Sequence, residues 1–339
     1  MKGMSLNGVF DLTVDKNPLV MSDIPIPTPG PDEVLIRISC CGVCHTELDE
    51  IEGRTPPPAY PVIPGHQVIG RVVSDGRKFR RNDRVGVAWI YSSCGKCAYC
   101  LSGRENLCPA FLATGRDRNG GYAEFMVIQE QFAYAIPDQF KDEDAAPLLC
   151  AGAIGYRSLK LSNLADGQTL CLSGFGASGH LVLKMARALY PHSRIIVFAR
   201  SEEEQNFSRM LGADWAGSFD EDPKEFAQAA IDTTPAWHPI VQSLRWLAPG
   251  GRLVINAIRK EASDQTALLE LDYAEHLWKE KEIKSVANIT PKDVEDFLSL
   301  AATASIKPEI EIYELKNANR ALADLKKKHV KGAKVLMVS

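Results

Sequence analysis

The sequence lacks the features that mark membrane-embedded and exported proteins. Its 339 residues contain no run of about 18 apolar side chains, so no transmembrane helix is predicted. The N-terminal stretch MKGMSLNGVFDLTVDKNP has no apolar core of the kind found in signal peptides. We therefore expect a cytoplasmic protein that does not bind membranes.

A large excess of charge of either sign is also missing. Lys and Arg together number 39 and Asp and Glu 43, for a net charge of −4, which argues against a nucleic-acid partner. Hydrophobic side chains make up 45% and charged ones 24% of the chain, proportions that exclude a disordered protein. At this length we expect about two domains of roughly 100–200 residues each.

Cysteines are present in an odd number, nine, which argues against a disulfide framework in a chain without an export signal. Four of them follow the pattern C-x2-C-x2-C-x7-C, a spacing typical of a structural zinc site closed by four thiolates. Buried free cysteines and an iron–sulfur cluster are the alternatives, and we favour zinc. The four residues are Cys94, Cys97, Cys100 and Cys108.

The pattern of apolar residues changes near Cys150. Before it, strands are predicted at 33–43, 68–74 and 82–90, separated by loops rich in Pro and Gly. After it, predicted strands at 169–174, 194–199, 229–235 and 251–258 alternate with helices at 179–189, 201–213 and 240–248. This alternation predicts an α/β fold with a parallel sheet and crossover helices. The residues from about 289 onward are predicted to add two helices and a strand at 334–339 that return to the first unit.

The sequence SGFGASGH follows the first strand of this alternating region and contains G-x-G-x-x-G. In such a motif the first glycine forms a tight turn, the second lets a pyrophosphate approach, and the third packs helix on strand. A dinucleotide is therefore expected on the helix N-terminus that follows. A tight strand–helix turn without a ligand is the alternative. The expected contact residues are Gly174, Gly176, Ala177, Ser178 and Gly179.

The end of the next strand bears on which dinucleotide binds. Sites for NAD place a carboxylate about 20 residues beyond the motif, but here Ala199, Arg200 and Ser201 occupy this stretch. A guanidinium can pair with a 2′-phosphate, so we favour NADP(H) over NAD(H). Glu202 and Glu203 would oppose a phosphate if they turned inward.

Five motifs, GVCHTE, PGHQ, CGKCAYC with its fourth cysteine, APLLCAG and SGFGASG, occur in the order found in zinc-dependent medium-chain alcohol dehydrogenases. The chain resembles the yeast-type and bacterial-type members of this family over essentially its whole length. The resemblance implies a GroES-like catalytic domain at 1–151, a Rossmann domain at 152–288 and a C-terminal segment at 289–339 that returns to the first domain. It also implies a homo-oligomer, a dimer or a tetramer.

The resemblance implies roles for residues that their spacing alone does not bring together. Cys44, His66 and Cys150 would bind a catalytic zinc, so that each chain holds two zinc ions. Thr46 would accept the proton of an alcohol whose hydride passes to the cofactor, and Trp89 would narrow the substrate pocket. His45 and Lys334 would lie near the cofactor pyrophosphate.

Three residues depart from the family pattern. Gln67 stands where a glutamate usually follows the ligand histidine, and Glu47 stands where an aspartate usually orients that histidine. Asp49 replaces the histidine that relays the proton in many members. Asp49 is either a buried proton acceptor or a solvated surface carboxylate, with water taking the proton.

Together these features predict a reversible oxidoreductase acting on an alcohol and its aldehyde or ketone. A dehydrogenase that prefers polyols or aryl alcohols is the nearest alternative. A zinc-binding or nucleotide-binding relative without turnover is a second alternative, and the ligand set together with Thr46 argues against it.

Overall fold

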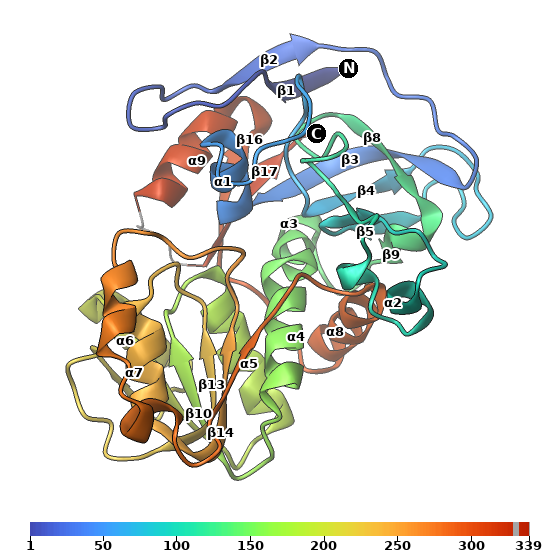
Figure 1. Ribbon diagram of the computed structural model, residues 1–339. Coiled ribbons are helices and arrows are strands. Elements are labelled where there is room, and N and C mark those ends of the chain that lie inside the picture. Colours follow the sequence, from blue (N-terminus) through green and yellow to red (C-terminus); the bar gives the residue numbers. More distant parts are fainter. Residues whose placement is uncertain (328–331, 339) are drawn as a thin grey trace. The chain divides into compact units, whose positions relative to one another are not determined.

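The computed structural model describes residues 1–327 and 332–338, and these residues divide into two compact units. The first unit comprises residues 1–153 together with the chain from 289 onward, and the second comprises 154–288. Figure 1 shows the elements of both units in sequence colours. Among the described helices, none is both long enough and apolar enough to span a bilayer.

The first unit is built mainly from antiparallel strands. Its largest sheet runs in the order β16-β17-β3-β4-β5-β9, and β8 pairs with β3. Its strands are β1 (Lys2–Leu6), β2 (Leu19–Asp23), β3 (Glu33–Val43), β4 (Val68–Val72), β5 (Arg84–Val87), β6 (Ile90–Ser92), β7 (Leu112–Ala113), β8 (Phe125–Gln129), β9 (Ala133–Ala135), β16 (Ile310–Glu314) and β17 (Ala333–Met337). Its helices are α1 (His45–Ile51), α2 (Ala98–Leu101), α3 (Asp142–Ala145), α8 (Pro291–Thr303) and α9 (Ala318–Lys326).

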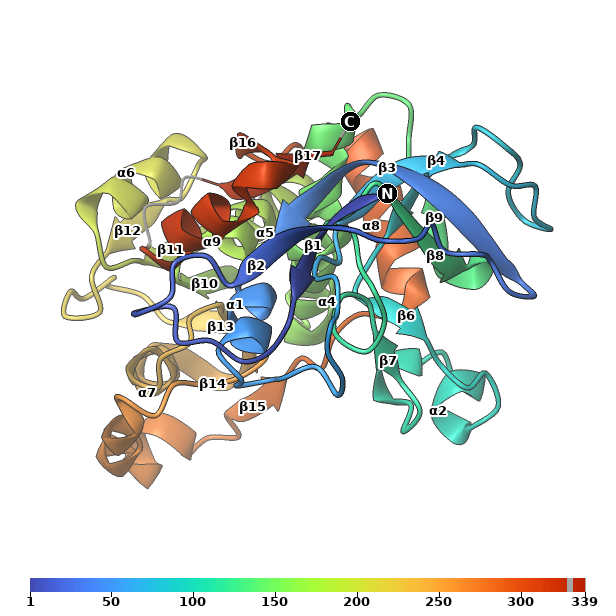
Figure 2. The same ribbon diagram turned by 90° about the horizontal axis from the view of Figure 1, so that it is seen from above.

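The last described strand completes this sheet next to one of its first strands. β17 lies antiparallel to β3, with Lys334 opposite Val43 and Leu336 opposite Cys41. Figure 2 shows the red β17 beside the blue β3. The inward-facing residues of both strands are apolar and fully buried, among them Ile36, Ile38 and Leu336. The C-terminal segment therefore helps to form the core of the first unit, because its side chains join the same apolar cluster.

The second unit contains a six-stranded parallel sheet with the order β12-β11-β10-β13-β14-β15. From β10 the chain adds β11 and β12 on one side and then returns to add β13, β14 and β15 on the other side. This order is that of doubly wound dinucleotide-binding domains. The strands are β10 (Thr169–Ser173), β11 (Arg194–Phe198), β12 (Trp215–Gly217), β13 (Ala227–Asp232), β14 (Leu247–Ile255) and β15 (Glu282–Ser285). The helices are α4 (Ala151–Ser162), which begins in the first unit, α5 (Ala177–Leu189), α6 (Glu202–Met210) and α7 (His238–Arg245).

The predicted fold class is confirmed, and several element boundaries differ from the prediction. The strand expected at 82–90 is two strands, β5 and β6. The helix expected at 240–248 ends at Arg245, because Leu247 already pairs with Ala227 in the sheet. The glycine pair at 250–251 therefore lies within β14, where Gly250 has a φ of +71°. Ser339, the end of the strand expected at 334–339, lies outside the described residues.

Candidate active site and nucleotide site

The first site residue, Cys44, lies at the junction of β3 and α1. The Glu47 carboxylate accepts a hydrogen bond of 2.7 Å from the Cys44 backbone N–H. This contact satisfies a free donor at the start of the helix and fixes the Glu47 side chain. The local sequence CHTE therefore places a thiol and a buried carboxylate on the same turn.

Three residues from distant parts of the first unit bring their ligand atoms together. Cys44, His66 and Cys150 have ligand atoms that all lie within 4.8 Å of one another. His66 Nε2 lies 3.2 Å from Cys150 Sγ, and His66 Nδ1 lies 2.7 Å from Glu47 Oε1. A carboxylate at this distance favours a proton on Nδ1, so Nε2 keeps its lone pair for a ligand in the cluster.

Hydrogen bonding in this cluster favours one thiolate. A hydrogen bond from Cys150 lowers the pKa of Cys44 well below 9.0 and raises the pKa of Cys150, and His66 lowers the pKa of Cys44 further. Two thiols and one imidazole with a fixed tautomer make a donor set that suits zinc and leaves a fourth position free. Cys44, His66 and Cys150 could therefore hold a catalytic metal ion.

Two further residues lie beside the cluster, as the sequence indicated. Thr46 Oγ1 lies 3.6 Å from Cys44 Sγ on the first turn of α1. The Trp89 ring lies 6.3 Å from the His66 ring and 5.6 Å from the Phe111 ring, measured between centroids. A hydroxyl and an aromatic wall thus flank the ligand atoms.

The other two departures from the family pattern, Gln67 and Asp49, are both buried. Gln67 packs its side chain against Gly42, where an added Cβ would come within 2.7 Å of Gln67 Oε1. Asp49 is only 6% exposed at its side chain and accepts a hydrogen bond of 2.6 Å from Arg54 Nε. The interpretation of Asp49 as a solvated surface carboxylate is therefore wrong, because the turn after α1 covers it and pairs it with Arg54.

Sequence reasoning missed Glu50, a carboxylate on the same helix. Its side chain is buried, and neither carboxylate oxygen has a hydrogen-bond partner among the described residues. Burial raises the pKa of Glu50 well above 4.5, and the charge of Glu47 adds to this effect. The helical spacing of Thr46 and Glu50 places both on one face, but the polar sequence HTELDE gives no sign that this face is buried.

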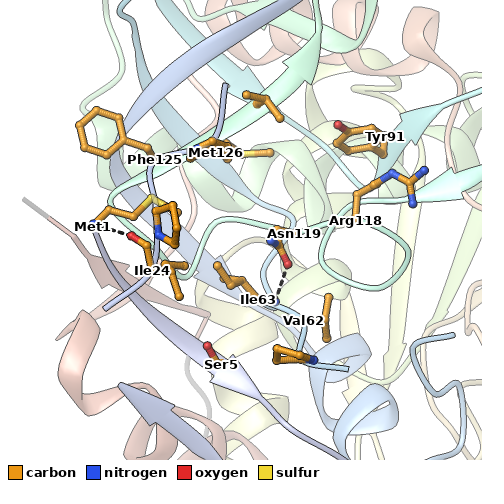
Figure 3. A pocket seen from close by; sticks show the side chains of 14 residues that line it. Met1, Ser5, Ile24, Val62, Ile63, Tyr91, Arg118, Asn119, Phe125 and Met126 are labelled. Carbon is orange, nitrogen blue, oxygen red and sulfur yellow. Dashed lines mark hydrogen bonds between the residues drawn. The ribbon is translucent and has the colours of Figure 1, made fainter. Parts of the chain in front are cut away.

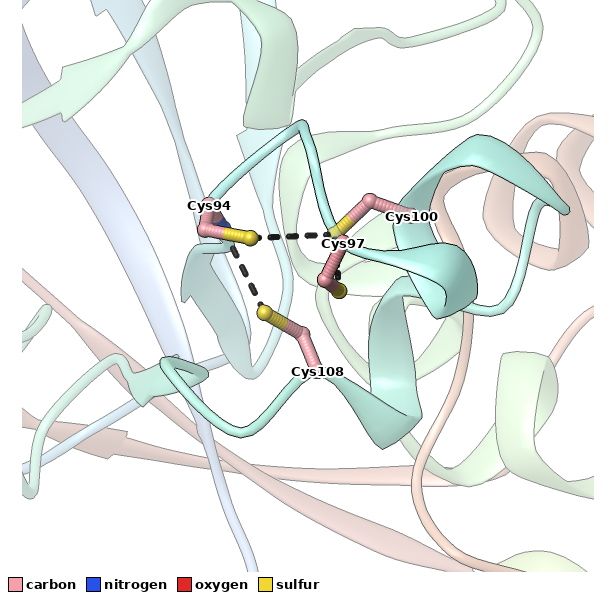
Figure 4. A group of neighbouring side chains, drawn as sticks. All are labelled: Cys94, Cys97, Cys100 and Cys108. Atoms are coloured by element: carbon pink, nitrogen blue, oxygen red, sulfur yellow. Dashed lines mark hydrogen bonds between the residues drawn. The ribbon is translucent and has the colours of Figure 1, made fainter.

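The four-cysteine motif forms a second cluster in the first unit. Figure 4 shows the four sulfur atoms converging from the loop before α2, from α2 itself and from the turn that follows. Sγ of Cys100 lies 3.9 Å from Sγ of Cys94 and 3.5 Å from that of Cys97, and the Cys94 N–H donates to Cys108 Sγ at 3.4 Å. Backbone N–H groups of Lys96 and Cys97 lower the pKa of Cys94 to about 6, which favours the thiolate. These four residues could hold a metal ion without an open position.

The glycine motif of the second unit has the geometry that each glycine was expected to supply. Gly174 has a φ of +84°, and Gly176, the N-cap of α5, has open space where a Cβ would stand. An added Cβ on Gly179 would lie 2.6 Å from the Gly174 carbonyl oxygen, so the helix and the turn are in close contact. Ala177 and Ser178 begin the helix and are partly exposed. The turn could therefore accept a pyrophosphate.

A positively charged side chain, Arg200, follows the last residues of β11. Arg200 is exposed and has no ion pair among the described residues, whereas Ala199 is buried and its carbonyl accepts from Gln205. Ser201 caps α6 and receives the backbone N–H of Glu204, as the capping-box pattern predicted. Glu202 and Glu203 are exposed on the first turn of this helix.

The two residues expected near the pyrophosphate from the first unit lie in different surroundings. His45 is exposed at the start of α1. Lys334 is 1% exposed, with its ammonium paired to Glu311 and donating to the Tyr313 hydroxyl at 3.0 Å. Its charge is therefore already balanced within the first unit.

A cavity of about 360 Å³ opens elsewhere in the first unit and is drawn in Figure 3. Its lining is largely apolar, with Ser5, Tyr91, Arg118 and Asn119 as polar members. Asn119 accepts a hydrogen bond from the Ile63 backbone. None of the candidate site residues lines it.

Comparisons with known proteins match this geometry. Residues 30–138 match the alcohol dehydrogenase GroES-like domain. A probable alcohol dehydrogenase, AdhA, of Mycobacterium tuberculosis is 38% identical over 96% of this chain and 94% of its own length. An alcohol dehydrogenase of Geobacillus stearothermophilus is 32% identical over 95% of this chain and 96% of its own. The structure of a cinnamyl alcohol dehydrogenase from Sorghum bicolor superposes with a TM-score of 0.84 at 26% identity, covering 99% of this chain and 97% of that one. The chain belongs to the zinc-type medium-chain alcohol dehydrogenase family.

Proposed function

We propose that the protein is a zinc-dependent alcohol dehydrogenase that holds two zinc ions per chain and prefers NADP(H). The observation that carries this proposal is the convergence of Cys44, His66 and Cys150, with Glu47 fixing the histidine tautomer. As a member of its family the protein is an NAD(P)-linked oxidoreductase, and these residues supply the chemistry for alcohols and their carbonyl products.

Each side chain has a distinct part in the proposed reaction. Bound zinc would polarise the substrate oxygen and bring the pKa of an alcohol hydroxyl toward neutrality, and the nicotinamide would take the hydride. Glu47 holds the His66 ring so that Nε2 faces the cluster. The Thr46 hydroxyl, beside Cys44, accepts the proton of the substrate, and Trp89 limits the width of the pocket.

Metal analysis combined with turnover tests this proposal. Elemental analysis of the purified protein should find two zinc ions per chain. Cys44→Ser or His66→Ala should lose one zinc and abolish turnover while leaving most of the fold intact. Finding one zinc or none in the wild-type protein would overturn the two-site proposal, and full turnover of both variants would overturn the catalytic assignment.

The cofactor preference depends on Arg200. Its guanidinium at the end of β11 is exposed and has no ion pair in the part of the chain that the structure describes, which supports pairing with a 2′-phosphate, a charge-assisted contact of about 1–3 kcal/mol. Arg200→Ala should raise the KM for NADPH and leave that for NADH nearly unchanged. A wild-type preference for NADH, or equal effects on both cofactors, would contradict the proposal.

An aryl-alcohol substrate is the second candidate, favoured by the pair of Trp89 and Phe111 beside His66 and by the likeness to the cinnamyl alcohol dehydrogenase of Sorghum bicolor. A panel of benzyl, cinnamyl, short aliphatic and polyol substrates separates it from the other classes. A higher kcat/KM for the aryl alcohols would support it, and a preference for polyols would exclude it. Lack of turnover across the whole panel would favour a non-catalytic relative.

We also infer a homo-oligomer, either a dimer or a tetramer, in the cytoplasm. β15 is the edge strand of the parallel sheet, and Ile283, Trp278 and Tyr273 on or near it are 46%, 54% and 64% exposed. Such an apolar edge supports association between chains. None of the nine cysteines forms a disulfide, which suits a reducing compartment. Light scattering would measure the assembly.

A further inference from the structure

A buried ion pair lies at the carboxyl end of β13, outside the sites described above. Asp232, the last residue of β13, is fully buried and pairs with the ammonium of Lys260, which is 7% exposed at its side chain. The same ammonium donates to the carbonyl oxygens of Thr234 at 2.7 Å and Ala236 at 3.1 Å. Lys260 therefore joins the segment that follows β14 to the loop that follows β13.

The loop held in this way contacts the glycine turn directly. The Thr233 backbone N–H donates to the Ser173 carbonyl at 2.9 Å, and the Thr233 hydroxyl donates to it at 3.1 Å. An added Cβ on Gly174 would lie 2.8 Å from Thr234 Cγ2, so the two segments are in van der Waals contact. The loop after β13 thus packs along one side of the turn expected to bind phosphate.

The position of this contact in the sheet points to a ligand. β10 and β13 are neighbours, and the strand order reverses between them. In doubly wound sheets the crevice at this reversal, outside the carboxyl ends of the strands, is where the ligand binds. The loop of residues 233–236 therefore forms a wall of that crevice.

We infer that Lys260 is a positioning residue for the dinucleotide: it holds the 233–236 loop against the glycine turn and so shapes the crevice. It acts through Thr233 and Thr234. A buried ion pair stabilises a fold little, since desolvation offsets the attraction, but it fixes backbone geometry through the extra bonds to carbonyl oxygens. The inference rests on the proposed function, in which this crevice binds NADP(H).

The test is Lys260→Met in the full-length, zinc-loaded protein. Lys281→Met is a matched control, because the Lys281 ammonium also caps two carbonyl oxygens of the second unit, those of Leu244 and Glu275, both at 2.8 Å. The measurements are the Kd for NADPH by titration calorimetry and the melting temperature without nucleotide. We expect Lys260→Met to weaken binding about tenfold or more, which is about 1.4 kcal/mol, and Lys281→Met to change it less than about twofold. Lys260→Met should also lower the melting temperature more, because it leaves Asp232 buried without its partner.

A second variant keeps the inference testable if Lys260→Met does not fold. Thr233→Val removes the hydroxyl contact with Ser173 and leaves the buried ion pair in place. It should weaken NADPH binding. The double variant with Lys260→Arg should lose less NADPH-binding free energy than the two single variants added together, because both substitutions act on one loop. NADPH affinity within about twofold of wild type in Lys260→Met, or in Thr233→Val, would overturn the inference. If the wild-type protein binds neither NADPH nor NADH, the proposed function itself fails.

Discussion

Three acidic residues of α1 are buried, and each has a different environment. Glu47 accepts the Cys44 N–H and contacts the His66 ring, whereas Asp49 pairs with Arg54. Glu50 has no hydrogen-bond partner among the described residues. A buried carboxylate without a partner is costly to ionise, because nothing replaces the water that it has lost. These differences lead to separate predictions for Asp49 and Glu50.

Asp49→Asn should affect stability more than turnover. The substitution removes one of the two ionic partners of Arg54, which also pairs with Glu52, and so a charged hydrogen bond of about 1–3 kcal/mol in free energy of unfolding. Because Arg54 already occupies this carboxylate, we expect alcohol oxidation to fall less than about tenfold, whereas Thr46→Val should fall about 100-fold or more. Chemical denaturation and steady-state kinetics check the two effects. A loss of about 100-fold in Asp49→Asn that added buffer base restores would show that Asp49 accepts the proton after all.

Glu50→Met should stabilise the protein, by about 1–3 kcal/mol for an unsatisfied buried polar group. The pKa of Glu50 is raised in the folded state, so the unfolded chain loses this proton more readily and wild-type stability falls as the pH rises above about 4.5. The advantage of Glu50→Met should therefore be smallest below that pH, where Glu50 is neutral in both states, and should grow as the pH rises from that point. Denaturant unfolding at several pH values measures this gap. A difference in free energy of unfolding that does not depend on pH would contradict the burial cost assigned to Glu50. A stabilised but inactive variant would point to a role of Glu50 in turnover.

The sequence could predict two groups of candidate metal ligands but not how the carboxylates around them are paired. The spacing of the four cysteines marks one group, whereas Cys44, His66 and Cys150 are brought together only by the resemblance to the family. The partner of Asp49 is Arg54, beyond the end of the helix, and the burial of Glu50 depends on how α1 packs in the unit. Such packing is not encoded in the spacing of polar residues.

At the scale of elements, the strands and helices with a clear apolar period were predictable, and their ends were less so. β3, β10, β11 and α6 lie where the sequence placed them, because apolar runs, the glycine turn and the Ser201 cap mark them locally. β14 begins earlier than predicted, at Leu247, since pairing with β13 continues through a register shift near Ala227. Pairing between strands overrides the local turn signal of a proline followed by two glycines.

In the loop of residues 94–108, which carries the four clustered cysteines, a bound metal ion would take the place of an apolar core. Its helix α2 is four residues long and contains no buried side chain. Metal binding energy then contributes directly to folding, so Cys94→Ser should lower the melting temperature, by about 2–4 °C for each kcal/mol lost. Cys171→Ala is a control thiol in β10, outside both clusters.

Zinc content and calorimetry check this prediction. Cys94→Ser should retain one zinc per chain and Cys171→Ala two. Equal zinc content in both variants, or a melting temperature of Cys94→Ser equal to that of the wild type, would contradict a structural metal in this loop.

At the scale of the whole molecule, the chain gives each unit its own core and its own chemistry. Both cysteine-containing clusters lie in the first unit, and the glycine turn and Arg200 lie in the second. The sequence indicated this division, because the β-rich and the alternating regions differ in pattern. It could not give the pairing of β17 with β3, since the register between strands some 290 residues apart is set by tertiary packing.

Hydrogen exchange of the full chain should reveal this division of chemistry. Removing metal with a chelator should speed amide exchange in residues 94–108, because four thiolates lose their common ligand. NADPH should slow exchange in 173–180 and 199–204, where the glycine turn and Arg200 would contact it, and a ligand at 100 times its Kd contributes about 2.7 kcal/mol. Adenosine 2′,5′-bisphosphate carries the 2′-phosphate without a nicotinamide and should protect mainly 199–204. If NADPH left 173–180 unprotected, the glycine turn would not be the nucleotide site, whatever the outcome of chelation in the first unit.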